Sequence, residues 1–143
     1  MDYRPLRVLL VEDDEAHAEI IKRSLRAQGV PPEVVHVSDG QEALDYLFST
    51  QGETSRRSDM VLLDLRLPKV NGHEVLRRIR SHPGLDDLVV VVLTTSAAEE
   101  DVSAAYGNRA NSYLVKPVGF EAFTALLDSL SSYWLSCNVY AGG

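Results

Sequence analysis

The stretch LRVLLVEDD, residues 6–14, joins a short, almost entirely apolar run to three consecutive carboxylates. A second apolar run, Met60–Leu63, ends in the same way at Asp64. Short runs without polar alternation are typical of strands at the centre of a parallel sheet that is covered on both faces. In such sheets ligand chemistry collects at the carboxyl ends of the strands. The two runs therefore predict an α/β protein with an acidic site at one edge of its sheet.

Apolar runs alternate along the chain with segments of helical periodicity. The runs are Leu6–Val11, Val34–Val37, Met60–Leu63, Leu88–Leu93 and Ser112–Val115. This alternation predicts βα units, and right-handed crossovers favour a doubly wound five-stranded parallel sheet of order 2-1-3-4-5. That order is the general rule for flavodoxin-like folds, and it makes the first and third strands neighbours. The strand ends at Glu12-Asp13 and at Asp64 should therefore meet.

Three segments carry the capping pattern in which Ser or Asn is followed three residues later by Glu or Gln. They are SDGQ at 38–41, NGHE at 71–74 and SAAE at 96–99. In this pattern the first side chain accepts a hydrogen bond from a backbone amide in the first helical turn. We therefore expect helices to begin after Ser38, Asn71 and Ser96.

Composition excludes several classes of protein. The 143 residues are 45% hydrophobic and 24% charged, as in a folded globular protein, and the net charge of −7 argues against nucleic-acid binding. The N-terminus has no apolar signal segment, and the run Leu88–Leu93 is too short to span a bilayer. A single Cys137 excludes an internal disulfide and a cysteine-based zinc site. We expect a cytoplasmic protein that binds neither nucleic acid nor membrane.

Convergence of Glu12, Asp13 and Asp64 would be costly without a cation. Two unit charges about 4 Å apart repel by roughly 4 kcal/mol at an effective dielectric near 20. A divalent ion such as Mg²⁺ or a nearby ammonium would relieve this repulsion. Thr94 follows the fourth apolar run, and Lys116 follows the fifth. Carboxylates, a hydroxyl and an ammonium at successive strand ends form a specific constellation.

Each of these residues also has an ordinary structural interpretation when it is taken alone. Asp13 and Asp14 could cap the first helix, Thr94 could serve a turn, and Lys116 could simply end a strand. Their joint occurrence favours a functional site. The histidines, by contrast, share no face and no metal-ligand spacing, and we expect them on the solvated surface. They are His17, His36, His73 and His82.

Five motifs occur in a fixed order along the chain. They are Val11-Glu12-Asp13-Asp14, Leu62-Leu63-Asp64-Leu65-Arg66-Leu67-Pro68, Asn71-Gly72, Leu93-Thr94, and Tyr113 with Lys116-Pro117. Together, from about Leu6 to Leu135, they resemble the receiver domain of bacterial two-component response regulators. The resemblance implies a flavodoxin-like receiver fold. It also implies a response regulator that accepts a phosphoryl group from a histidine kinase and switches conformation to signal.

The resemblance assigns a role to each residue of the site. Asp64 would be the phosphoacceptor. Asp13, Asp64 and the backbone carbonyl of Arg66 would bind Mg²⁺ directly, and Glu12 would act through a bound water. The phosphate-binding and switch residues would be Thr94, Lys116 and Tyr113. A carboxylate is a competent nucleophile for phosphoryl transfer, so the residue types suit the chemistry.

Other functions fit the fold less well. A haloacid-dehalogenase-like phosphatase also uses a strand-end Asp, but it needs a second Asp two residues later, where this chain has Arg66. A flavodoxin-like cofactor binder needs small polar residues after the first strand, where residues 12–15 are all acidic and repel phosphate. A pseudo-receiver should lack Asp64 or Lys116. We therefore expect a signalling protein, with self-catalysed phosphoryl transfer and slow autodephosphorylation as its only reactions.

Features outside the site narrow the resemblance. The long connection Thr50–Ser58, the sequence Leu-Thr-Thr-Ser at 93–96 and the ending Tyr-Trp-Leu at 133–135 resemble the single-domain regulators that accompany bacterial phytochrome histidine kinases. We therefore expect one receiver domain over residues 1–143, with a core of about 6–135 and a short apolar tail at 136–143. A bacteriophytochrome is the expected type of kinase.

The last helix predicts an interaction surface. Its apolar stripe consists of Phe120, Phe123, Leu127, Leu130 and Trp134. Three adjacent residues span about 300° of a helix, so Tyr133, Trp134 and Leu135 cannot all face one core. With Val139 and Tyr140 they predict an exposed apolar patch and a homodimer through the last helix and tail, together with the fourth helix and fifth strand. The alternative is a tail that folds back over the sheet edge.

Overall fold

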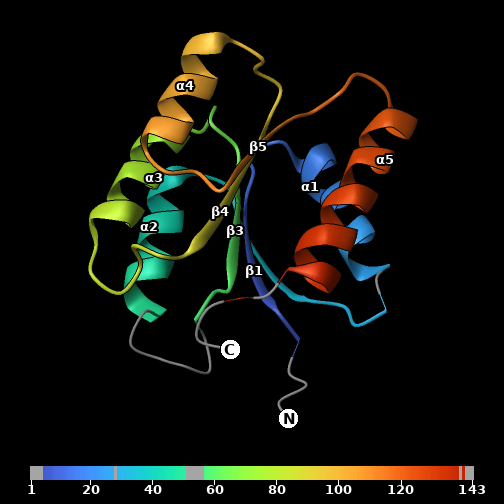
Figure 1. Ribbon diagram of the computed structural model, residues 1–143, viewed down its shortest axis with the longest axis horizontal. Coiled ribbons are helices and arrows are strands. Elements are labelled where there is room, and N and C mark those ends of the chain that lie inside the picture. The colour runs from blue at the N-terminus through green and yellow to red at the C-terminus, as the bar shows by residue number, and fades with distance from the viewer. Residues whose placement is uncertain (1–4, 28, 51–56, 139, 141–143) are drawn as a thin grey trace.

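The computed structural model describes residues 5–27, 29–50, 57–138 and 140, and it shows a parallel sheet between two layers of helices (Figure 1). The strands are β1 (Arg7–Val11), β2 (Glu33–Val37), β3 (Met60–Leu63), β4 (Val89–Thr94) and β5 (Ser112–Val115). The helices are α1 (Glu15–Arg26), α2 (Gly40–Thr50), α3 (Gly72–Ser81), α4 (Glu99–Gly107) and α5 (Phe120–Ser131), followed by a π-helical turn, η1 (Ser132–Cys137).

The strand order is β2-β1-β3-β4-β5, as the sequence predicts. All neighbouring strands are parallel, and the register aligns the ends of the two central ones, with Val11 opposite Leu63. The chain therefore leaves β1 and β3 at the same level of the sheet. This register places the residues that follow the two strands, Glu12 and Asp64, next to each other.

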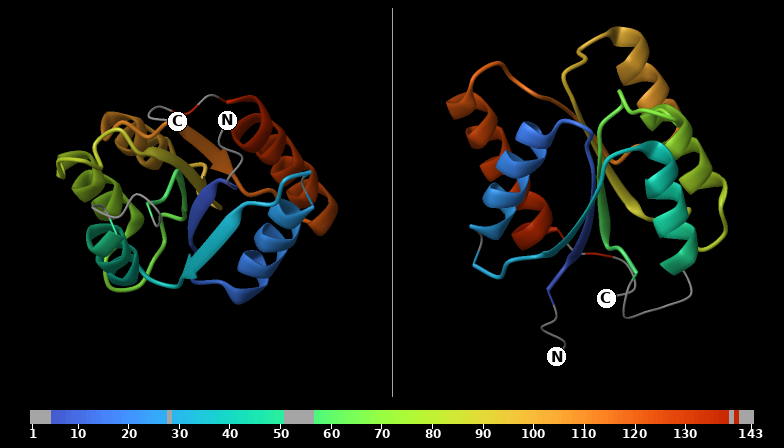
Figure 2. Two further views of the ribbon diagram at one scale, coloured as in Figure 1. Left: turned by 90° about the horizontal axis from the view of Figure 1, so that it is seen from below. Right: turned by 180° about the vertical axis from the view of Figure 1, so that it is seen from behind.

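Both faces of the sheet are covered, which explains why its strands read as continuous apolar runs. Helices α1 and α5 cover one face, and α2, α3 and α4 cover the other (Figure 2). Alternate residues of each central strand enter opposite cores: Leu9 packs towards α2 and α3, and Leu10 packs towards α1 and α5. Each such buried side chain contributes about 1.5–3 kcal/mol. Within the described residues, no helix has both the length and the hydrophobicity that a bilayer span requires.

The start of α3 is pressed against the loop that carries Asp64. A Cβ atom on Gly72 would lie 2.3 Å from the backbone oxygen of Asp64, so only glycine fits there. The prediction that Asn71 caps this helix is confirmed, because its side chain accepts a hydrogen bond from the Glu74 amide at 3.1 Å. The Asn-Gly pair thus fixes the position of the Asp64 loop.

The other two predicted caps are wrong. Helix α2 begins at Gly40, and the side chain that accepts from the Glu42 amide (2.8 Å) belongs to Asp39, not to Ser38. The helix thus starts one residue later than predicted, and the Asp39 carboxylate takes the amide three residues further on. The residue before α4 is Ala98, not Ser96, and alanine has no side chain that can cap. The Ser96 hydroxyl lies two residues earlier and bonds to the Ala98 amide and to Asp101.

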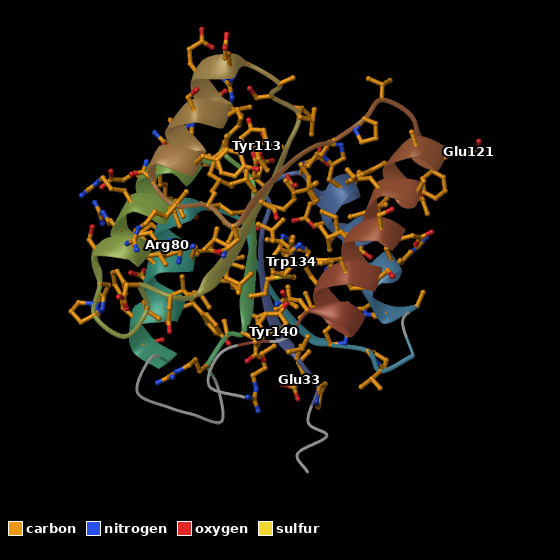
Figure 3. The ribbon with its side chains drawn as sticks, viewed as in Figure 1. Glu33, Arg80, Tyr113, Glu121, Trp134 and Tyr140 are labelled. Carbon is orange, nitrogen blue, oxygen red and sulfur yellow. The ribbon has the colours of Figure 1, made fainter. Side chains whose placement is uncertain are left out.

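Trp134 and Tyr140 pack against the core between the sheet and α5, so the predicted exposed patch is wrong for these two residues. Trp134 is only 9% exposed, and the hydroxyl of Tyr140 donates to the Trp134 carbonyl at 2.8 Å. Both rings lie at the end of the sheet opposite Tyr113 (Figure 3). In the π-helical turn the Asn138 amide donates to the carbonyl five residues earlier, which shifts the rotation of the following residues away from α-helical spacing.

The remaining members of the predicted patch have different positions. Tyr133 is 54% exposed, Leu135 is partly buried against the core, and Val139 lies outside the described residues. Of the predicted stripe on α5, Phe123, Leu127 and Leu130 are buried as expected. Phe120 is 65% exposed instead, because it is the first residue of the helix and lies beyond the edge of the core.

Candidate functional site

The carboxylates predicted to converge do so at the carboxyl end of the sheet. One oxygen from each of Glu12, Asp13 and Asp64 lies within 4.8 Å of the other two. Glu12 and Asp64 are buried, at 1% and 7% exposure, whereas Asp13 is exposed. Three carboxylate oxygens of this kind form a hard donor set, which fits a divalent ion such as Mg²⁺ or Mn²⁺.

Lys116 reaches into this cluster from the residue after β5. Its ammonium nitrogen lies 2.5 Å from Glu12 Oε1, 3.2 Å from Asp64 Oδ2 and 3.0 Å from Nδ1 of His17. An ammonium has three N–H donors, so each of the three acceptors can be satisfied. The His17 contact requires a bare Nδ1, which means that this imidazole nitrogen accepts. The lysine therefore offsets the repulsion between two buried carboxylates.

Burial changes the acid–base behaviour of Glu12. Loss of solvation raises the pKa of its carboxyl to about 7, against the lowering effect of the hydrogen bond and charge of Lys116, and the charge of Asp64 adds to the increase. Occupation of the site by a cation requires the ionised form of this carboxyl. Cation binding should therefore be linked to release of a proton from Glu12.

The neighbouring Asp14 has a structural role. Its side chain accepts a hydrogen bond from the His17 amide at 3.1 Å and caps α1, and this bond lowers the pKa of the carboxyl. The capping role that the sequence left open for both residues therefore belongs to Asp14. Asp13 is free to face the cluster.

Thr94 and Tyr113 occupy the same rim. Thr94 ends β4 with a fully buried side chain, and the Ser96 amide lies 3.5 Å from its hydroxyl. Tyr113, labelled in Figure 3, donates its hydroxyl to the Ser96 carbonyl at 2.8 Å, and partial burial raises the pKa of its phenol. Arg66 contributes backbone to the site, since its amide lies 3.3 Å from Asp64 Oδ1, while its side chain is exposed.

The expectation that all four histidines are solvated is wrong, because all four are partly buried and bonded. His17 accepts from Lys116, and the His36 ring lies 2.8 Å from the Glu12 carbonyl. His73 Nε2 lies 2.9 Å from a carboxylate oxygen of α4, and the ring of His82 packs against Phe48.

An open pocket of about 500 Å³ adjoins the acidic cluster. It is bounded by Asp13, by the loop that follows Asp64, and by His73 and Asp101 from α3 and α4. The pocket thus lies beside the acidic cluster and is lined by two carboxylates, an imidazole and the backbone of the loop after β3.

Comparison with known proteins identifies the family. Residues 8–128 match the model of the response regulator receiver domain. The chain is 46% identical over 134 residues to the probable methanogenesis regulatory protein FilR2 of Methanothrix harundinacea, covering 94% of this chain and 86% of the relative. Its fold matches the crystal structure of the phosphorylated cyanobacterial phytochrome response regulator RcpA (TM-score 0.90, 38% identity, 96% and 99% coverage). It also matches the Mn²⁺-bound form of response regulator Rcp1 (TM-score 0.89, 36% identity, 96% and 100% coverage).

Proposed function

The chain belongs to the response regulator receiver domain family, and we propose that it is a phosphoacceptor switch in which Asp64 takes a phosphoryl group from a histidine kinase. The observation that carries the proposal is the contact of Lys116 with both Glu12 and Asp64 inside an acidic cluster. Two buried carboxylates on one ammonium are a costly arrangement for stability alone. They are useful where a third negative group, the phosphoryl group, has to be received.

The transfer itself asks little covalent chemistry of the protein. An oxygen of Asp64 forms a bond to phosphorus as the N–P bond of a phosphohistidine breaks, and the departing imidazole nitrogen keeps the electron pair and takes a proton. Lys116 Nζ lies 3.2 Å from Asp64 Oδ2, so an N–H group can pass to a phosphoryl oxygen without a large movement. Asp64 then carries an acyl phosphate whose charge Lys116 helps to balance.

We propose Mg²⁺ as the resident cation. Asp13, Asp64 and the backbone carbonyl of Arg66 would hold it directly, and Glu12 would do so through a water molecule. The proposal is supported by the hard-oxygen donor set and by the Mn²⁺-bound structure of the relative Rcp1. When bound, the cation supplies positive charge against the phosphoryl oxygens.

Thr94 and Tyr113 would report the modification. The buried hydroxyl of Thr94 lies at the rim, where it could donate to a phosphoryl oxygen. Tyr113 follows the same loop, because its hydroxyl is bonded to the Ser96 carbonyl. A movement of Thr94 towards the modified Asp64 would therefore change the positions of Tyr113 and of α4.

Intact mass spectrometry tests this function. Wild type incubated with acetyl phosphate should gain the mass of one phosphoryl group when Mg²⁺ is present, and none when Mg²⁺ is chelated. Asp64→Asn should gain none, whereas Asp128→Asn, which changes an exposed carboxylate on α5, should behave as wild type. Equal modification of Asp64→Asn and wild type would disprove the assignment.

We propose that the protein is cytoplasmic and that its kinase partner is of the phytochrome type. Support comes from the likeness to the phytochrome response regulator RcpA, while the similarity to FilR2 points to a different input. Phosphotransfer from a purified phosphorylated phytochrome kinase and from a matched kinase without a phytochrome sensor separates the two. Transfer from the second kinase alone would reject the narrower partner and keep the phosphoacceptor function.

We propose a homodimer through the last helix and tail, which include η1, together with α4 and β5. Because Trp134 is buried and Tyr140 is partly buried, fewer residues support the dimer than the sequence indicated. The support consists of three exposed side chains, Tyr106, Val115 and Tyr133. Light scattering of wild type and of Val115→Glu, with and without phosphodonor, tests it. A monomer mass for wild type under both conditions across micromolar concentrations would disprove the dimer.

A further inference from the structure

A second polar cluster lies at the start of α4, where it lines the pocket beside the acidic cluster. Its centre is the carboxylate of Asp101, which is within 2.5 Å of the Ser96 hydroxyl, 2.9 Å of His73 Nε2 and 3.5 Å of the Arg66 guanidinium. The phosphoryl chemistry described above uses none of these side-chain contacts. The cluster therefore needs an explanation of its own.

The three donors come from different parts of the chain. Arg66 is in the loop after β3, His73 is in the first turn of α3, and Ser96 is in the loop between β4 and α4. Asp101 itself belongs to the first turn of α4. The Asp101 carboxylate thus connects α4 to the loop that follows Asp64 and to the loop that follows Thr94. Its ionised form is stabilised, since the hydrogen bond from Ser96 and then that from His73 lower the pKa of Asp101.

His73 depends on this carboxylate for its orientation. Among the described residues, its Nδ1 is a buried atom without a hydrogen-bond partner. Nε2 must carry the proton to donate to Asp101, whether the ring is neutral or charged. A bare Nδ1 acceptor is then the less costly arrangement, so the ring is held by its single bond to Asp101.

Ser96 connects the cluster to the switch residues. Its hydroxyl donates to Asp101 and accepts from the Ala98 amide at 3.2 Å, which fixes the loop before α4. Its carbonyl accepts the hydroxyl of Tyr113, and its amide lies 3.5 Å from the hydroxyl of Thr94. The residue that Asp101 holds is therefore the same residue that contacts both switch side chains.

We propose that Asp101 is a positioning residue that holds the β4–α4 loop, and through Ser96 the side chain of Tyr113, in the inward arrangement before any phosphoryl group is present. The role of Asp101 in the unphosphorylated protein does not depend on the proposed function of Asp64. Its consequence does: phosphorylation of Asp64 would complete an inward arrangement of Tyr113 that is already largely formed. A ligand shifts such an equilibrium only by its differential affinity for the two states. Without the Asp101 contacts, phosphorylation has to supply the whole shift.

A general effect of acidic residues at a helix start is the competing explanation. Glu99 and Glu100 occupy the same first turn, and both are exposed. They gain the same favourable interaction with the positive end of the helix. Substitution of Glu100 therefore serves as a matched control for charge and helix position.

The experiment compares Asp101→Ala, Ser96→Ala and Glu100→Ala with wild type in the absence of phosphodonor. Ring resonances of ¹³C-tyrosine report the environment of Tyr113, which Tyr113→Phe assigns, and the half-exposed Tyr106 gives the reference for an outward ring. Backbone hydrogen exchange at Ser96 and Ala98 reports the loop. Loss of a hydrogen bond to a charged group should raise exchange there about tenfold.

The expected result is that Asp101→Ala and Ser96→Ala both move the Tyr113 resonances towards those of an exposed tyrosine, and that Glu100→Ala does not. A purely structural acid would lower the melting temperature without moving Tyr113. If Asp101→Ala does not fold, Ser96→Ala decides. Wild-type Tyr113 resonances and loop exchange in the folded variants would overturn the proposal.

Phosphorylation measured by mass spectrometry distinguishes the proposed role of Asp101 from the proposed phosphoacceptor function of Asp64. Asp101→Ala should still gain one phosphoryl group at saturating acetyl phosphate, at an initial rate about tenfold below wild type, because a less populated arrangement reacts more slowly. If wild type itself gains none, the phosphoacceptor function fails, while the Tyr113 and exchange measurements still decide the role of Asp101. An unchanged initial rate in a variant with a displaced Tyr113 would overturn the consequence for phosphorylation.

Discussion

The two ends of the sheet handle buried polar groups in different ways. At the carboxyl end, carboxylates from β1 and β3 are placed together and depend on Lys116 for compensation. At the amino end, the aromatic rings of Trp134 and Tyr140 lie beside the strand starts, and the Tyr140 hydroxyl donates to a backbone carbonyl. An ion pair at that end joins Arg7 to Glu33, whose carboxylate is largely exposed. The carboxyl end of the sheet therefore carries the electrostatic cost of two buried carboxylates close together. This cost distinguishes a reactive site from the structural packing at the amino end.

Arg80 shows how the amino end uses a charge, and Figure 3 places it on α3. Its guanidinium donates to the Arg109 carbonyl at 2.8 and 3.0 Å, to the Leu88 carbonyl at 2.5 Å and to Asn111 Oδ1 at 2.9 Å. These acceptors are all neutral. The cation thus joins α3 to the segments before β4 and β5 without a buried carboxylate.

The largest expected effect is at the amino end. Trp134→Ala should lower the free energy of unfolding by about 4 kcal/mol, because it removes a large buried side chain and the platform for Tyr140. Urea unfolding measures this loss, and Tyr133→Ala, at an exposed position, is the control. Uptake of one phosphoryl group under conditions where the variant is folded should be unchanged. Loss of that uptake would show that the two ends are not separate.

The second effect is at the carboxyl end. Lys116→Met should lower the free energy of unfolding of the metal-free protein by about 3 kcal/mol at pH 8, because it leaves Glu12 and Asp64 buried without a cation. Millimolar Mg²⁺ should restore part of this loss, as it should not for Trp134→Ala. Thermal and urea unfolding with and without Mg²⁺ check the difference. Lys69→Met removes an exposed lysine and should cost little; a similar loss there would contradict the explanation.

The sequence predicts the carboxyl end well and the amino end poorly, for physical reasons. Continuous apolar runs identify buried parallel strands, and the order of such strands fixes which strand ends meet, so the convergence of Glu12 and Asp64 follows from short-range patterns. Whether Trp134 or Tyr133 faces the core depends on a local π-helical turn. No periodicity in the sequence contains that information.

The predictions for two of the helix caps and for histidine positions are wrong for a related reason. The hydroxyl of Ser96 accepts from the Ala98 amide, two residues on, and donates to the carboxylate of Asp101, so it does not cap the first turn of α4. His36 meets Glu12 only because β2 pairs in register with β1, which places it opposite Leu10. Histidine can pack its ring against other side chains and can form hydrogen bonds through its two nitrogens. Its residue type alone therefore does not predict whether it is buried or exposed.

A smaller effect concerns pH. Burial raises the pKa of Glu12 to about 7 in the metal-free protein, while the unfolded value is 4.5. The folded state then binds more protons than the unfolded state between these values, so this group makes the metal-free protein less stable as pH rises from 4.5 to 7. Mg²⁺ affinity should change in the opposite direction and rise about tenfold from pH 6 to pH 8, since the cation needs the ionised carboxyl.

Calorimetric titration with Mg²⁺ at pH 6, 7 and 8 measures this linkage. Glu12→Gln should flatten the dependence, because it removes the group that releases the proton. Asp14→Asn, which changes the helix cap outside the cluster, should keep it. An equally steep dependence in Glu12→Gln would show that another group is responsible.

The smallest expected effect is that of Asp13→Asn on the metal-free fold. Asp13 is exposed and shares a pocket with two carboxylates, so its neutralisation removes repulsion and should leave the melting temperature unchanged or raise it by less than about 2 °C. The stabilisation that Mg²⁺ gives wild type should be largely absent, because a ligand has been lost. Thermal unfolding with and without Mg²⁺ measures both, and Glu15→Gln, on the first turn of α1, is the control. A fall of several degrees in the metal-free variant would mean that Asp13 supports the helix start, and the division of roles between Asp13 and Asp14 would be wrong.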